Sequence, residues 1–302
     1  MTMSAARIAT PPLPGTRVKK LLYATDFSEA SRKALPIVAA IARKFDSELF
    51  IANVWYPLSY SMGRPDAPAA LEAEQFEDAV ACTREFSKCA ELAGLNTTVV
   101  VEQGEVEEEI ARVVQQRGVD LVVVGTHGRT GWKRLLMGSV SESLFRKLTC
   151  PVLTVGPALS ERFSREFALK RLLFPVDFSE ESRSVFPFIA SLASQHGCEL
   201  VLVHVLPEET GTNPDARKLA EPLRKDMELV YSPYLQKSCK AEFVIDFGDS
   251  VERILSLAET HNVDLIAMGV RNAPEFVTHF RNTITYRVVL EAKCPVLTYR
   301  AS

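Results

Sequence analysis

The sequence predicts an α/β protein of two tandem domains, each a five-stranded, mainly parallel sheet with helices on both faces. Strand and helix patterns alternate along the chain, which is typical of right-handed βαβ units. The series occurs twice, beginning with KKLLYATDFSEASRKALPIVAAIARKF at Lys19 and KRLLFPVDFSEESRSVFPFIASLASQH at Lys170. The chain has 302 residues, enough for two domains of about 150 residues.

The offset between the two copies changes along the chain. It is 151 residues at Asp26 and Asp177 but 144 residues at Cys150 and Cys294. The first copy therefore has an insertion between its second and third strands, where PLSYSMGRPDAP indicates a loop. We expect a flexible N-terminus over residues 1–17, domains over residues 18–156 and 170–302, and a polar linker over residues 157–169.

In the first copy, apolar runs predict the strands and stretches of helical period separate them. Strands are expected near residues 20–25, 48–54, 97–102, 120–125 and 151–155. Helices are expected near residues 29–44, 70–93, 105–117 and 139–148. Ser28 gives the first helix a polar start, and the glutamates from Glu105 to Glu109 suit the positive end of the third helix.

The second copy repeats this pattern. Its strands are expected near residues 171–176, 199–205, 241–246, 264–269 and 295–299. Its long helix, near residues 214–237, contains Pro222 and Pro233. Because proline removes a helical hydrogen bond and its ring clashes with the preceding turn, we expect this helix to be kinked or broken.

Composition narrows the function classes. A net charge of -3 and a pI near 6.0 argue against nucleic acid or an anionic membrane surface as the main partner. The sequence lacks a run of about 18 apolar residues and an apolar signal segment, so we expect a cytoplasmic protein. The six cysteines have no metal-ligand spacing. We therefore predict no metal site, and buried thiols at Cys150 and Cys294.

The stretch VDLVVVGTHGRTGWKRLLMGSVS, from Val119 to Ser141, concentrates glycine and positive charge after a buried strand. Gly138 and Ser139 then begin a helix, whose free N–H groups and dipole suit a phosphate. Neither GxxxxGK[ST] nor GxGxxG occurs in the stretch. A simple turn is the alternative. His127 is equally well explained by turn stabilisation and by phosphate contact, and Trp132 by a lid role and by an exposed contact.

Asp26 ends the first strand, and Gly125 ends the fourth. Ligands of open parallel sheets bind beyond the carboxyl ends of the strands, where the strand order reverses. If these strands are neighbours, Asp26, Val54 and the loop after Gly125 share one crevice. Asp26 could accept a hydrogen bond from a ribose hydroxyl or adenine amino group, or it could cap the helix near Ser28. Its two carboxylate oxygens allow both roles.

The spacing of Gly125, Gly128 and Gly138-Ser139 resembles the nucleotide-binding motif of the ATP-binding branch of the universal stress protein family. The resemblance covers about residues 18–155 and 170–299. It implies a Rossmann-like (adenine nucleotide alpha-hydrolase-like) fold that binds ATP, AMP or ADP, with Mg²⁺ as a companion of ATP. Ala24 departs from a common proline, which Pro175 keeps. The resemblance implies adenosine contacts at Asp26, Val54, Val124 and Gly125, and phosphate contacts at Gly128, Gly138, Ser139, Val140 and Ser141.

The second copy departs from the motif. Asn272 and Asn282 replace two phosphate-cradling glycines, while Asp177 and Gly269 remain. We interpret this copy as a structural pseudo-subunit, with a weak or altered site as the alternative. Family members commonly dimerise through their last strands. The strands at 151–155 and 295–299 are therefore expected to pair antiparallel within the chain, as an intramolecular pseudo-dimer, which leaves further homo-oligomers open.

Three functions fit these observations. The first is a stress-response regulatory protein that binds one nucleotide in its first copy and acts on an unknown protein partner. The second is a slow ATP hydrolase or phosphotransferase at the same site, for which the loop offers Lys133, Arg134 and Arg129 without an adjacent acid. The third is a protein-interaction module without nucleotide. We expect weak ATPase activity at most, and no catalytic residue is assigned.

Overall fold

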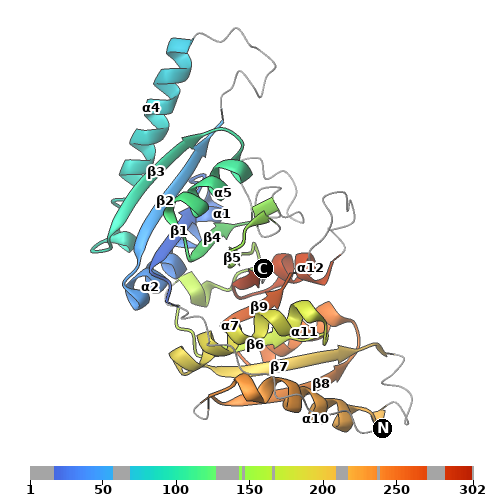
Figure 1. The fold of residues 1–302 in the computed structure, drawn as a ribbon. Helices are drawn as coiled ribbons and strands as arrows, with labels where there is room; N and C mark the ends of the chain where they lie inside the picture. Colours follow the sequence, from blue (N-terminus) through green and yellow to red (C-terminus); the bar gives the residue numbers. More distant parts are fainter. Residues whose placement is uncertain are drawn as a thin grey trace.

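The structure of the chain is a computed structural model. It describes residues 17–56, 69–126, 143–144, 147–164, 167–208, 217–236, 239–270 and 283–300. Strands and helices alternate through both copies, which confirms the α/β fold class (Figure 1). No helix among these residues has both the length and the apolar composition needed to cross a membrane.

The first copy follows the predicted order of elements, with strand bounds within one residue of those expected. Its elements are β1 (Lys20–Ala24), α1 (Glu29–Arg32), α2 (Leu35–Phe45), β2 (Glu48–Trp55), α4 (Ala69–Phe86), η1 (Ala90–Leu92), β3 (Thr97–Gln103), α5 (Val106–Arg117), β4 (Leu121–Gly125) and β5 (Val152–Val155). Of the helix expected at 139–148, residues 143, 144 and 147 are described, and they are helical.

The second copy has the same order of elements. After η2 (Glu161–Ser164) come β6 (Arg171–Pro175), α7 (Glu180–His196), β7 (Glu199–Leu206), α10 (Ala220–Tyr231), η3 (Ser232–Tyr234), β8 (Ala241–Phe247), α11 (Ser250–Thr260), β9 (Leu265–Gly269), α12 (Ile284–Glu291) and β10 (Val296–Tyr299).

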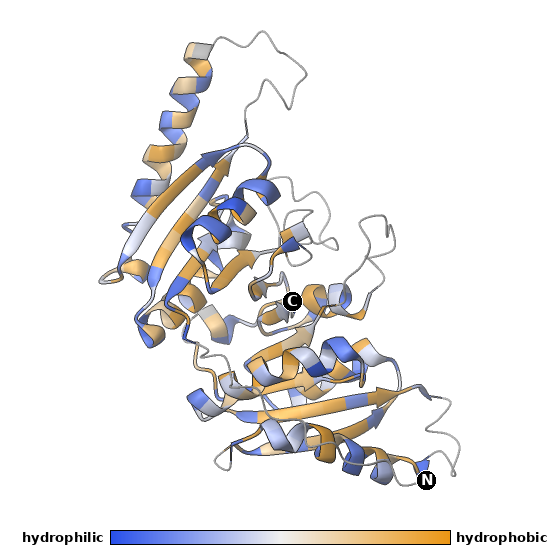
Figure 2. Ribbon diagram, in the orientation of Figure 1, coloured by the Kyte–Doolittle hydropathy of each residue, from blue (hydrophilic) through white to orange (hydrophobic). Residues whose placement is uncertain are grey.

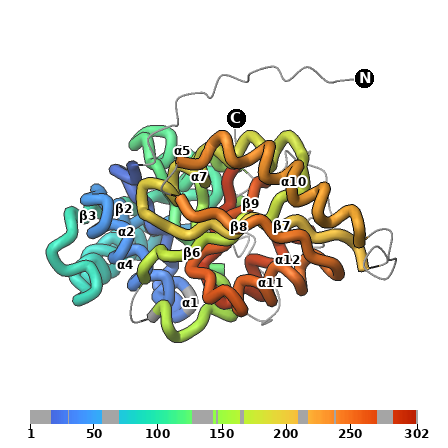
Figure 3. The backbone as a smooth tube through the Cα atoms, turned by 90° about the horizontal axis from the view of Figure 1, so that it is seen from below, coloured from blue at the N-terminus to red at the C-terminus, as the bar shows by residue number. Residues whose placement is uncertain are grey.

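The described strands form one sheet of ten, in the order β3-β2-β1-β4-β5-β10-β9-β6-β7-β8. Strands of the same copy pair in parallel. In the first copy β1 lies between β2 and β4, so the strand order reverses between β1 and β4, as expected. The apolar residues of β1 and β4 are buried in the core, and the strands stand out as the apolar layer in Figure 2. Seen from below, the two copies lie side by side (Figure 3).

The two copies join through their last strands. β5 and β10 pair antiparallel, which confirms the predicted intramolecular pairing. Leu153 pairs with Leu297, its equivalent in the repeat, so the pseudo-two-fold axis passes close to this pair. All four residues of β5 are buried, because the strand has neighbours on both sides.

Two predicted helices are interrupted or shorter than expected, and the third is broken near Pro233, as expected. The helix expected at 29–44 is interrupted between α1 and α2, and Pro36 lies in the first turn of α2, where its missing N–H is harmless. Pro187, its equivalent, lies inside the continuous helix α7. The helix expected at 70–93 ends at Phe86. Of the residues expected at 214–237, α10 spans Ala220–Tyr231, and Pro233 follows in η3.

The connector between the copies packs against the second copy, although its composition suggested only a polar linker. Phe163 is buried, and the Arg162 guanidinium donates to the backbone oxygen of Val263. Arg162 also lies 3.6 Å from the carboxylate of Asp264. The connector therefore has a fixed place on the second copy.

Candidate functional site

In the first copy, β1 and β4 are neighbours that diverge where they end. Ala24 is paired with Val124, but the next residues turn to opposite sides. The N–H of Thr25 donates to the oxygen of Ala52 on β2 (2.9 Å), and the N–H of Thr126 donates to the oxygen of Val155 on β5 (3.1 Å). The segments that follow β1 and β4 therefore separate at the point where the strand order reverses, and open α/β sheets bind their ligands at such points.

Asp26 lies just beyond the end of β1, after Thr25, and its two carboxylate oxygens have different surroundings. Oδ1 accepts from the N–H of Ser28 (3.1 Å) and from its hydroxyl (2.7 Å). Oδ2 is buried and has no hydrogen-bond partner among the described residues. The helix cap itself is Ser28, which accepts from the N–H of Ser31. Asp26 therefore orders the helix start with one oxygen and leaves the other for a donor.

This arrangement requires an unfavourable backbone. Phe27, between Asp26 and Ser28, has φ 65°, in the left-handed region that bulky residues avoid. Such strain typically costs about 1–3 kcal/mol, and a buried polar atom without a partner costs about 1–3 kcal/mol more. A buried network supports the turn: the hydroxyl of Thr25 hydrogen-bonds to that of Ser31 (2.9 Å), and the Tyr23 hydroxyl donates to the oxygen of Ser31 (2.7 Å). Burial raises the pKa of Tyr23 to about 12, so this donor stays protonated.

Strand β2 contributes a residue that sequence reasoning missed. The amide of Asn53 donates to the oxygen of Thr25 (2.8 Å), so it fixes the chain just before Asp26. Val54, the expected adenosine contact, is half-buried near the end of β2. The equivalent of Asn53 in the second copy is His204, whose Nδ1 lies 2.7 Å from the oxygen of Val176. Comparison of the two copies could have revealed this position, because both residues can donate to the same carbonyl.

Val124 is buried at the end of β4, and Gly125 follows it, half-buried and paired with Val155. The strand order thus brings Asp26, Val54, Val124 and Gly125 to the same edge of the sheet. The other expected contacts, Gly128, Gly138, Ser139, Val140 and Ser141, lie outside the described residues, as do His127 and Trp132.

The second copy has a cavity of about 520 Å³ in the equivalent place. It is lined by residues at the carboxyl ends of β6, β7 and β9, among them Asp177, His204 and Gly269. Oδ1 of Asp177 accepts from the N–H and hydroxyl of Ser179, as Asp26 does from Ser28. Asn272 and Asn282 lie outside the described residues. The second copy therefore keeps the turn and a cavity, with a histidine in place of Asn53.

Cys150 and Cys294 have the properties of packed thiols, whereas Cys82 is exposed. Cys294 is buried and Cys150 half-buried, and burial raises the pKa of each to about 12. Such thiols stay protonated, so they are poor nucleophiles. In the part of the chain that the structure describes, His, Cys, Asp and Glu do not form a group of three suited to a metal.

Comparison with known proteins agrees with the fold and the repeat. The model of the universal stress protein family matches twice, over residues 17–156 and 168–300. Universal stress proteins MJ0531 and MJ0577 of Methanocaldococcus jannaschii are 32% and 31% identical, and each aligns with 45% of this chain and with 81% and 94% of its own length. A universal stress protein from Archaeoglobus fulgidus superimposes with a TM-score of 0.70 at 21% identity, covering 95% of this chain and 100% of its own.

Proposed function

Because the chain belongs to the universal stress protein family, we propose that its first copy binds an adenine nucleotide between the ends of β1 and β4. The observation that carries this proposal is the buried, unpartnered Oδ2 of Asp26 at the reversal point of the sheet. A ribose hydroxyl or adenine amino group would supply the missing donor. Hydrogen bonds to a charged group contribute about 1.5–3 kcal/mol, enough to discriminate between ligands.

In this proposal, adenosine lies beside Asp26, Val54, Val124 and Gly125. The phosphates lie on the basic glycine loop, at Gly128, Gly138, Ser139, Val140 and Ser141. Mg²⁺ enters with ATP, on its phosphates. The functional domains are residues 18–156 and 170–302, and nucleotide occupancy of the first is the signal that a protein partner reads in a stress response.

The test is the substitution Asp26→Asn, with Asp177→Asn as its matched control. Asparagine keeps an oxygen for Ser28 but places an amide donor where Oδ2 lies, so donor faces donor. We expect at least a tenfold loss of ATP and AMP affinity by calorimetry, or about 1.4 kcal/mol, with little change in the melting temperature. Asp177→Asn should leave the affinity unchanged. An unaltered affinity in Asp26→Asn would sink this assignment, and so would two equal sites per chain.

Turnover should be slow or absent. Phosphoryl transfer needs groups that position the nucleophile and neutralise the leaving phosphate. Neither the described residues at the ends of β1, β2 and β4 nor the loop sequence supplies a second acid beside Asp26. We expect ATP hydrolysis well below the roughly 1–1000 per second of ordinary enzymes. A steady-state phosphate-release assay measures this. A rate within that range that disappears in Asp26→Asn would make the protein an ATPase.

A further inference from the structure

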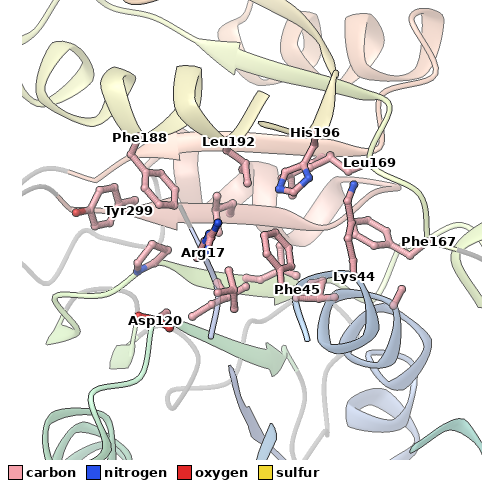
Figure 4. Close-up of a pocket in the computed structure, with 18 residues that line it drawn as sticks. Arg17, Lys44, Phe45, Asp120, Phe167, Leu169, Phe188, Leu192, His196 and Tyr299 are labelled. Atoms are coloured by element: carbon pink, nitrogen blue, oxygen red, sulfur yellow. The ribbon is translucent and has the colours of Figure 1, made fainter. Parts of the chain in front are cut away.

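Another cavity lies at the seam between the two copies, and its lining includes none of the expected nucleotide contacts (Figure 4). It has a volume of about 220 Å³ and lies between α2 of the first copy and α7 of the second, over β5 and β10. Its lining is largely apolar and contains pairs of repeat-equivalent residues, such as Leu153 with Leu297 and Ile41 with Leu192. The cavity therefore exists only because the two copies are joined.

One equivalent pair is unlike. Phe45 and His196 occupy the same position in the repeat, and their rings meet edge to face with centroids 4.8 Å apart. Nε2 of His196 is buried, and within the part of the chain that the structure describes it has no hydrogen-bond partner. Burial and, second, the charge of Lys44 lower the pKa of His196 to about 4. The imidazole is therefore neutral near pH 7, and its tautomer with a proton on Nε2 can donate.

The charged groups at this cavity leave positive charge unbalanced. Lys44 and Arg17 both line it and are exposed, and neither forms an ion pair with a carboxylate among the described residues. Asp120 also lines it, but its Oδ2 accepts from the backbone N–H groups of Lys19 and Lys20, both at 2.8 Å. Figure 4 shows the Lys44 amine beside the His196 ring at one end. An anionic group between them would pair with the Lys44 amine and accept a hydrogen bond from the His196 ring.

We propose that this cavity binds a small monocarboxylic acid with an apolar body. The carboxylate lies between Lys44 and Nε2 of His196, and the body occupies the apolar space over Leu153 and Leu297. This inference is independent of the nucleotide site, because the two sites share no described residue.

The size of the cavity sets the class of acid. A dry cavity of about 150 Å³ admits benzene, so about 220 Å³ accommodates a medium-chain fatty acid or a simple aromatic acid. Long-chain acids would have to leave much of the chain in solvent. One carboxylate matches the single Lys44–His196 pair, since the equivalent of Lys44 in the second copy is the neutral Gln195.

The probe is octanoate, with 1-octanol as the uncharged comparison, titrated calorimetrically into the full chain. We expect octanoate to bind at least tenfold more tightly than octanol. Lys44→Met and His196→Phe should each reduce octanoate affinity at least fivefold. Lys88→Met, at a residue whose side chain is 70% exposed and does not line the cavity, should leave it unchanged. His196→Phe introduces the residue that the first copy has at the equivalent position, Phe45, so the seam should stay intact. A melting temperature close to that of the unaltered protein would confirm this.

A second readout follows His196 itself. A carboxylate beside the ring stabilises its charged form, so the pKa measured by NMR should rise from about 4 when octanoate is present. Octanoate should bind Asp26→Asn as tightly as the unaltered protein, which separates this site from the nucleotide proposal. Absence of octanoate binding at millimolar concentration would overturn the proposal. Equal affinity for octanol would overturn the role of the carboxylate.

Discussion

A chain ending at residue 160 is expected to self-associate into a dimer. Removing the second copy exposes β5, whose four buried residues then form an unpaired apolar edge. The same edge can pair with itself, because Leu153 already pairs with its repeat equivalent Leu297 in antiparallel register. Sedimentation of the fragment should give twice its mass, and the full chain should show no association through this edge.

The control for this experiment is Leu153→Arg in the same fragment. Arginine at the centre of the edge opposes its own copy and should leave the fragment monomeric, with a lower melting temperature. If the unaltered fragment stayed monomeric and as stable as the full chain, β10 would not be needed to cover β5, and the second copy would need another role.

The substitution Gly156→Ala should destabilise the junction between the copies. Gly156 follows β5 and is buried, and a Cβ there would lie 2.4 Å from the backbone oxygen of Val289 on α12. Because the position of the Cβ is fixed by the backbone of residue 156 and its neighbour is a backbone oxygen, the clash is relieved only by moving the helix away from the strand. We expect a loss of about 1–3 kcal/mol and a melting temperature lower by several degrees, measured by calorimetry.

The matched control is Arg300→Ala, at the position equivalent to Gly156 in the second copy. Arg300 donates to the oxygen of Lys147 at 3.3 Å at a solvent-exposed contact. Removing it should change the stability by less than about 1 kcal/mol. A Gly156→Ala variant as stable as Arg300→Ala would contradict the clash.

Elements governed by local pattern could be predicted from the sequence. Val122 to Val124 form an apolar run, as expected of a strand that is buried on both faces, and the run can be recognised from the sequence alone. The β5–β10 pairing was also predictable, because the repeat places two similar apolar strands at the ends of the copies. The interruption before Pro36 was not, since the equivalent Pro187 lies within an unbroken helix.

At the candidate site, the sequence predicted that Asp26 and Gly125 lie at the same end of the sheet. It could not predict which carboxylate oxygen binds Ser28 and which has no partner. That division depends on the turn at Phe27, which gives Oδ1 to Ser28 and leaves Oδ2 without a donor. Asn53 was missed because its partner, the oxygen of Thr25, is 28 residues away and reached only through the β1–β2 pairing. The contact between Phe45 and His196 could not be predicted either, because it too joins residues that are far apart in the sequence.

The Phe45–His196 contact also bears on how a ligand can be oriented. In a dimer of identical chains, a residue beside the two-fold axis must face its own copy. A pocket on that axis then has two equal ends, and an asymmetric guest can enter in either direction with equal free energy. Covalent fusion of unlike copies lifts this requirement, so phenylalanine can face histidine across the seam. The two ends of the pocket therefore differ, and the proposed ligand would bind in one direction.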